Sequence, residues 1–101
     1  MWLMVMFDLL TEISKDRESY RHFREGLIDD GFTQMQYSVY SRYCSTEEIL
    51  RINTDKVTGA LPPEGQIRVL SFTDKQFERM KVFYGQYLFP AEEPPLQISM
   101  F

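Results

Sequence analysis

An aspartate at the end of the opening apolar segment is the residue of this sequence best placed to do chemistry. Asp8 follows seven consecutive apolar residues, Met1 to Phe7. A short apolar run of this kind is typical of a central β-strand that is covered on both faces. A carboxylate at the point where such a strand reaches solvent is held by rigid backbone, which suits a metal ligand or a general base. A structural role as a turn or helix-capping residue is the alternative reading of Asp8.

Three arginines at helical spacing form a second candidate site, this one for nucleic acid. Arg17, Arg21 and Arg24 fall in one stripe of a predicted helix, while acidic residues lie on its far side. The forked donors of arginine match phosphate oxygens, so phosphate contact is one interpretation. A solvated helix face whose arginine stems cover apolar neighbours is the other, and the sequence does not separate the two. Weaker candidates of the same kind are Arg42, Arg51 and Arg68.

The elements that must position these residues alternate between strand and helix patterns. They are a strand ending at Asp8, a helix over 16–30 with a buried stripe of Tyr20, Phe23 and Leu27, one strand or two over 32–43, a helix from the capping box Ser45–Glu48 to Gly59, a strand over 66–72, a helical turn capped by Thr73, and a strand over 82–84. This order predicts an α+β fold, a ferredoxin-like βαββαβ sandwich with an extra C-terminal strand.

A proline-spaced tail follows the predicted domain, which spans residues 1–89. Pro90, Pro94 and Pro95 set apart the strand-like segment Leu96–Phe101. An apolar strand left in solvent is a liability, so we expect residues 90–101 to pair with a sheet edge, either across a dimer or on a partner protein.

Composition limits the classes of function. The chain has 101 residues, enough for one domain, and a net charge of −4, which argues against non-specific nucleic-acid binding over its whole surface but leaves room for a local basic track. No apolar run reaches 18 residues and the opening run lacks a basic leader, so we expect neither a membrane span nor a secretory signal. The single cysteine, Cys44, fits a reducing compartment, and we expect a cytoplasmic protein.

Several short motifs, taken in order, indicate a family. They are Phe7-Asp8-Leu9, then Arg17, Tyr20, Phe23-Arg24 and Leu27, then Gly31-Phe32, the string Gln36-Tyr-Ser-Val-Tyr40, and Thr73-Asp-Lys-Gln-Phe77. Over roughly residues 1–87, this series resembles the small CRISPR-associated adaptation protein, the second of the core Cas proteins, usually described as an endoribonuclease.

The resemblance implies a specific chemistry and assembly. It implies a homodimer of ferredoxin-like protomers, with Asp8 as the Mg²⁺ ligand and catalytic carboxylate of a nuclease acting on single-stranded RNA or double-stranded DNA. It also implies a CRISPR-associated integrase as partner, with spacer-precursor DNA carried along the dimer. One carboxylate per chain makes a poor Mg²⁺ site, whereas two brought together by a two-fold axis make a plausible one. A non-catalytic structural subunit and a ferredoxin-like toxin ribonuclease are the alternative functions.

Overall fold

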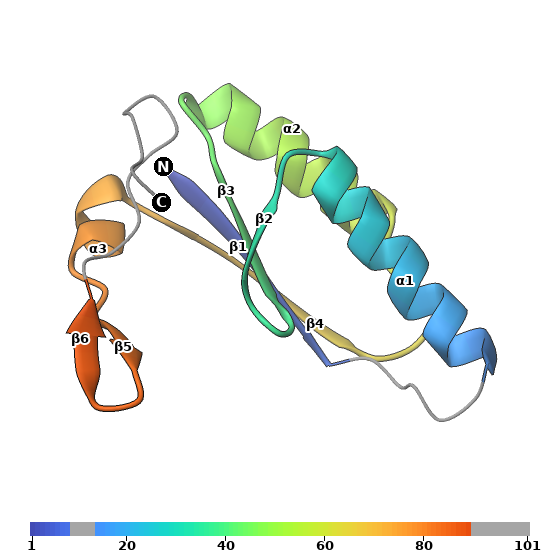
Figure 1. Cartoon of the computed structure of the whole chain (residues 1–101). Helices are drawn as coiled ribbons and strands as arrows, with labels where there is room; N and C mark the ends of the chain where they lie inside the picture. The colour runs from blue at the N-terminus through green and yellow to red at the C-terminus, as the bar shows by residue number, and fades with distance from the viewer. Residues whose placement is uncertain (9–13, 90–101) are drawn as a thin grey trace.

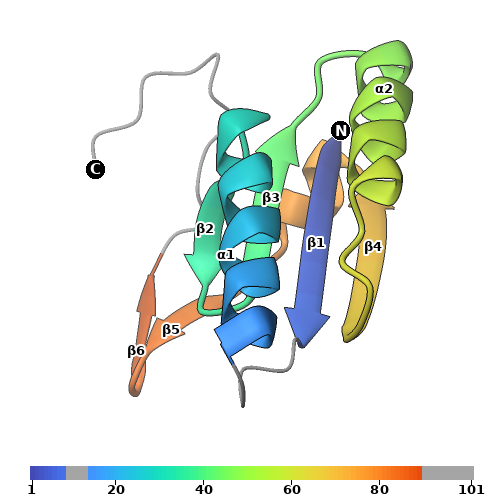
Figure 2. The same cartoon turned by 90° about the vertical axis from the view of Figure 1, so that its right-hand side faces the viewer.

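A four-stranded antiparallel sheet organises the chain. In the computed structural model, which describes residues 1–8 and 14–89, the strand order is β2-β3-β1-β4, so the opening strand is central as predicted. Helices α1 and α2 lie side by side over one face of this sheet, while α3 and the small β5–β6 hairpin lie on its other side (Figures 1 and 2). The arrangement confirms the ferredoxin-like α+β fold.

The elements have the following bounds. The strands are β1 Trp2–Asp8, β2 Thr33–Gln36, β3 Val39–Tyr43, β4 Gln66–Phe72, β5 Val82–Tyr84 and β6 Tyr87–Phe89. The helices are α1 Ser14–Asp29, α2 Glu47–Gly59 and α3 Asp74–Glu78. In the described part of the chain, neither α1 nor α2 nor α3 has the length and apolar character needed to cross a membrane. The predicted tail, 90–101 with its strand Leu96–Phe101, lies outside the described residues.

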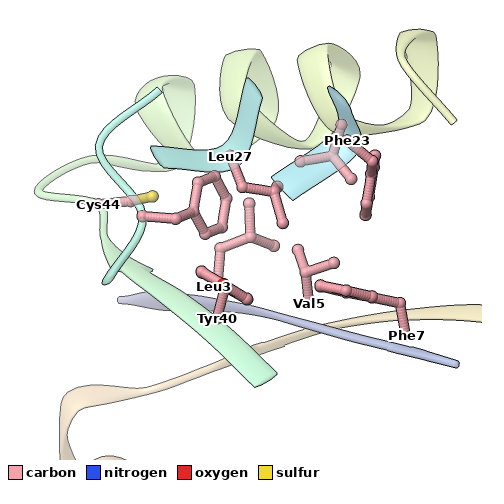
Figure 3. Packing of buried hydrophobic residues seen from close by; sticks show 9 residues of the cluster. Leu3, Val5, Phe7, Phe23, Leu27, Tyr40 and Cys44 are labelled. Atoms are coloured by element: carbon pink, nitrogen blue, oxygen red, sulfur yellow. The ribbon is translucent and has the colours of Figure 1, made fainter. Parts of the chain in front are cut away.

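The helix-covered face of the sheet holds the hydrophobic core. Leu3, Val5 and Phe7 alternate along β1 toward the helices and are nearly inaccessible to solvent. Phe23 and Leu27 of α1 descend onto them, which confirms the predicted apolar stripe of that helix (Figure 3). The same cluster also contains Phe32, Tyr40, Cys44 and Val57. Because side chains alternate along a strand, burying one set on this face sends the other set to the opposite face.

That opposite face is only partly covered by the described residues. Near one end of β1, Trp2 stacks on Phe77 of α3, with ring centroids 3.9 Å apart. Further along, Met4 and Met6 are half-buried, and Leu70 of β4 is 50% exposed. Among the described residues, the expected cover on the second face of the first strand is complete at Trp2 and partial at Met4 and Met6, since α3 has only five residues and cannot span the sheet.

Helix boundaries follow local capping, with small shifts from the sequence prediction. The second helix is capped by Thr46, whose hydroxyl accepts a hydrogen bond from the Ile49 amide at 3.1 Å, rather than by Ser45. The third is closed by the reciprocal bonds between Thr73 and Gln76 that the sequence predicts. Helix α1 begins at Ser14, two residues before the predicted start.

The strand pattern resolves one open question and adds an element. Residues 32–43 form two strands separated by a turn at Tyr37 and Ser38, and the ladder between them shifts register between Gln34 and Gln36. A last strand, β6, was not predicted. It pairs with β5 across a tight turn in which Gly85 has φ +62°, a conformation that glycine adopts readily.

Candidate functional site

Asp8 lies where three strands meet at one end of the sheet. It is the last residue of β1 and is exposed, and its register partner, Gln66, is the first residue of β4. The turn that leads into β3 is fixed beside it, because the Phe7 amide donates to the Ser38 carbonyl at 3.1 Å. The carboxylate therefore projects from a backbone that is hydrogen-bonded on both sides, which confirms the anchored, solvent-reaching position expected from the sequence.

A shallow hollow of about 240 Å³ surrounds this carboxylate. It is lined by Met6, Phe7, Asp8, Ser38, Val39, Gln66 and Arg68. Asp8 is the acidic group of the lining, Arg68 the basic one, and Ser38 and Gln66 are neutral groups that carry oxygen. The hollow thus combines hard oxygen donors with one positive charge.

These oxygen atoms are suited to bind Mg²⁺ weakly. Mg²⁺ prefers oxygen ligands, keeps several of its waters, and is often bound by one or two carboxylates together with substrate phosphate. Within residues 1–8 and 14–89 there is no cluster of three or more His, Cys, Asp or Glu side chains suited to a metal ion. Among the described residues that line the hollow, Asp8 is the acidic one, so it would be the charged ligand of such an ion.

Arg68 shares the face and the end of the sheet with Asp8. It pairs with Met6, two residues along β1 from Asp8, so the two charged side chains are diagonal neighbours on adjacent strands. Such diagonal positions lie about 7–8 Å apart, within reach of a long side chain. None of the ion pairs found among the described residues joins them. Sequence reasoning ranked Arg68 low, because only the strand register brings it to Asp8.

The predicted arginine stripe lies in the helix layer rather than in the hollow. Arg17 and Arg21 are exposed on α1. Arg24 is half-buried, and its Nε donates to the Tyr40 hydroxyl at 2.9 Å, so this arginine also ties α1 to the core of the sheet. The helical alignment of the three residues is confirmed, while their contact with nucleic acid stays a prediction.

Arg42 lies toward the opposite end of β3 from the hollow and takes part in a structural network. Its Nη1 donates to the carbonyl of Asp30 and to Oδ1 of Asn53, both at 3.2 Å. Asn53, itself buried, donates in turn to the Ile49 carbonyl at 2.8 Å. The structure does not bring Arg42 to Asp8, and its guanidinium links the end of α1 to α2.

Two groups near the core have shifted pKa values. Burial raises the pKa of Tyr20, with hydrogen bonding to Ser38 acting in the opposite direction. Burial also raises the pKa of the Cys44 thiol. Both groups therefore remain protonated at neutral pH, and both lie outside the lining of the hollow.

Comparison with known proteins identifies the family. The model of the family described as CRISPR associated protein Cas2 matches residues 1–80, which include Asp8 and the whole four-stranded sheet. The chain belongs to the Cas2 family. A curated relative from Parvibaculum lavamentivorans, named CRISPR-associated endoribonuclease Cas2, is 43% identical over 101 residues and covers all of both chains.

Other Cas2 relatives are similarly close. The protein of the same name from Flavobacterium psychrophilum is 40% identical over all of this chain and 88% of its own length. The one from Lacticaseibacillus rhamnosus is 42% identical over 84% of each chain. These matches confirm the resemblance inferred from the sequence motifs.

Proposed function

We propose that this Cas2-family protein is a Mg²⁺-dependent endoribonuclease with Asp8 as its catalytic carboxylate and metal ligand. One observation carries the proposal: Asp8 projects from the end of the central strand into a solvent-open hollow that offers oxygen donors and one positive charge. The names of the curated relatives, which are endoribonucleases, support RNA as the substrate. Nothing in the fold favours the toxin ribonuclease considered as an alternative, and the family match favours the CRISPR protein.

The active form in this proposal is a homodimer. The face of the sheet that carries Asp8 is apolar and partly open, with half-buried Met4 and Met6 and a Leu70 that is 50% exposed. Phe83, 55% exposed on β5, borders the same face together with Met80 and Val82. A second copy packed on this face would bury these side chains and bring two Asp8 carboxylates toward one two-fold axis. Two carboxylates would supply the charge that one chain lacks.

Within the site, the chain's own groups bind and orient the substrate. Asp8 would fix the ion at the end of a hydrogen-bonded strand, so that little reorganisation accompanies binding. Ser38 and Gln66 line the same hollow and offer hydrogen bonds to substrate or to ordered water. A bound Mg²⁺ would neutralise charge at the phosphate and make water more acidic.

The same dimer would serve as a scaffold for DNA in spacer integration. Its partner would be the CRISPR-associated integrase, and the spacer-precursor DNA would contact the stripe formed by Arg17, Arg21 and Arg24. The exposure of Arg17 and Arg21 supports this local track in a chain whose net charge is −4. The tail, 90–101, would provide a strand for dimer or integrase contact. A solely structural subunit is the alternative, favoured by the presence of a single carboxylate, Asp8, among the described residues that line the hollow.

Substitution of Asp8 by Asn tests the nuclease. The change is nearly isosteric and lies at an exposed position, so the thermal unfolding midpoint should stay within a few degrees of wild type. Cleavage of a labelled single-stranded RNA in Mg²⁺ should fall by about a hundredfold or more. Chelation of the metal from the wild type should have the same effect.

The matched control is Asp55→Asn, which removes an exposed carboxylate from α2, far from the hollow in sequence and in layer. It should leave cleavage unchanged. Equal metal-dependent cleavage by purified wild type and Asp8→Asn would refute the assignment of Asp8. A wild type without cleavage above background would leave the scaffold as the function.

A further inference from the structure

We propose that Arg68 binds the backbone phosphate of single-stranded RNA in the Asp8 hollow, and so positions the strand for cleavage. The proposal rests on the nuclease function proposed above and adds a substrate-binding residue to it. Among the described residues that line the hollow, Arg68 is the one with a cationic side chain.

The pairing of two strands, and not a flexible loop, sets the position of Arg68 relative to Asp8. Arg68 is opposite Met6 and Gln66 is opposite Asp8, in an unbroken seven-residue ladder between β1 and β4. Both charged residues therefore lie on the face turned away from α1 and α2. Since both belong to paired strands, the separation between their backbones is fixed by the sheet.

The charge arrangement points to a ligand that carries negative charge and can also take a cation. A carboxylate alone repels phosphate, whereas an arginine next to it offers two parallel donors that suit phosphate oxygens. An Arg68 tightly paired with Asp8 would be neutralised, but no ion pair between them is found among the described residues. Both side chains are exposed, so they can engage one phosphate from two sides, Arg68 directly and Asp8 through a metal ion.

The shape of the hollow favours a single strand over a duplex. It holds about 240 Å³ and is open to solvent, and Met6, Phe7 and Val39 contribute to its lining. One nucleotide can lie across such a surface with its phosphate between the two charges. The exposed tyrosine of the adjoining turn, Tyr37, is 79% exposed and could stack on a neighbouring base.

The test measures RNA binding separately from cleavage. Affinity for a fluorescein-labelled single-stranded RNA is measured over a range of salt concentrations with proteins that carry Asp8→Asn, so that no strand is cut. Into this background are introduced Arg68→Gln, Arg68→Lys and, as a matched control, Arg51→Gln. Arg51 is exposed on α2, in the other layer, where it pairs with Asp55 at 3.6 Å. Light scattering reports the oligomeric state of every variant.

The expected result is a loss specific to Arg68. Arg68→Gln should bind the RNA about tenfold more weakly, as for one lost charge-assisted contact. The magnitude of the slope of log affinity against log salt should decrease by about 0.7, as expected for one lost phosphate contact to a single strand. Arg68→Lys should restore the slope but only part of the affinity, because lysine keeps the charge without the fork. Arg51→Gln should match the background protein in both.

Two outcomes would overturn the proposal: an Arg68→Gln protein that binds like the Arg51→Gln control, or a loss of binding that accompanies a change in oligomeric state. The second result would assign Arg68 to an interface between protomers. In the Asp8-containing enzyme, Arg68→Gln should raise KM for the same RNA. If wild type fails to cleave, the nuclease proposal fails, yet the binding measurements still decide the role of Arg68.

Discussion

The two faces of the sheet differ in how far their side chains are shielded from water. On the face turned toward the helices, the side chains of β1 are sealed among aromatic and aliphatic neighbours, with Val5 and Tyr40 fully buried. On the other face, the same strand carries half-buried methionines and ends in an exposed carboxylate. One strand thus belongs to two environments, because alternate residues point in opposite directions. The buried side chains on one face anchor the strand whose last residue, Asp8, is an exposed carboxylate on the other face.

Removing one apolar side chain from each face should give the largest contrast. Phe23→Ala empties a site in the sealed core and should cost about 3–5 kcal/mol of unfolding free energy. Leu70→Ala, on the open face, should cost about 1 kcal/mol or less in dilute protein, since half of that side chain is already in water. Urea unfolding followed by circular dichroism measures both. If Phe23→Ala does not fold, Phe23→Leu provides a milder version. Equal losses at the two sites would show that the open face is not open in solution.

Substituting one polar residue in the helix layer and one beside Asp8 should show the same difference between buried and exposed positions, with smaller losses of stability. Asn53→Ala removes a buried side chain that accepts from Arg42 and donates to a helix carbonyl, and it should cost about 1–3 kcal/mol. Gln66→Ala, at the exposed start of β4 beside Asp8, should change stability by only about 0.5 kcal/mol. The same urea titration checks both. A large loss at Gln66 would mean that the hollow contributes to folding as well as to chemistry.

The smallest effect concerns pH and the buried thiol of the core. Because burial raises the pKa of Cys44, the thiol stays protonated in the folded state when the unfolded chain begins to ionise, above about pH 8.5. The contribution of the protonated Cys44 thiol to the free energy of unfolding is complete below that pH. It declines as the pH rises toward the pKa of the thiol in the folded state. The difference in unfolding free energy between wild type and Cys44→Ala should therefore be constant from pH 6 to 8 and then shrink. A difference that does not change up to pH 10 would mean that the thiol is accessible to water.

Most of the fold could be predicted from residue patterns that repeat within a single helix or strand. The apolar run of the first strand was sufficient to predict its central position in the sheet, and the helical spacing of Tyr20, Phe23 and Leu27 was sufficient to predict the buried side of α1. Strand β6 was missed because it has only three residues, although Gly85 followed by one residue between apolar pairs is a known hairpin signal. The N-cap was predicted one residue too early because Ser45 and Glu48 match the capping-box pattern, whereas Thr46 caps the helix with its hydroxyl alone.

The residues of the candidate site likewise differ in whether the sequence alone could place them. Asp8 could be singled out from the sequence because its position at a strand end is a local property. The proximity of Arg68 could not, because it depends on the pairing of β1 with a strand about sixty residues later. The network of Arg42 was likewise hidden, since one of its acceptors follows α1 and the other lies on α2, while the sequence shows only a cation in a strand. Register and helix packing are non-local, and they decide which charges meet.

The even spacing of Met4, Met6 and Asp8 has a consequence for how such a chain can change by insertion or deletion. A single residue lost from the middle of β1, with the strand end kept in place, would turn the preceding side chains over. The methionines would then enter the core and Leu3 and Val5 would face water. A loss of two residues would preserve both faces and only shorten the strand. Unless a bulge absorbs the difference, the segment that leads to Asp8 can therefore vary in length only in steps of two.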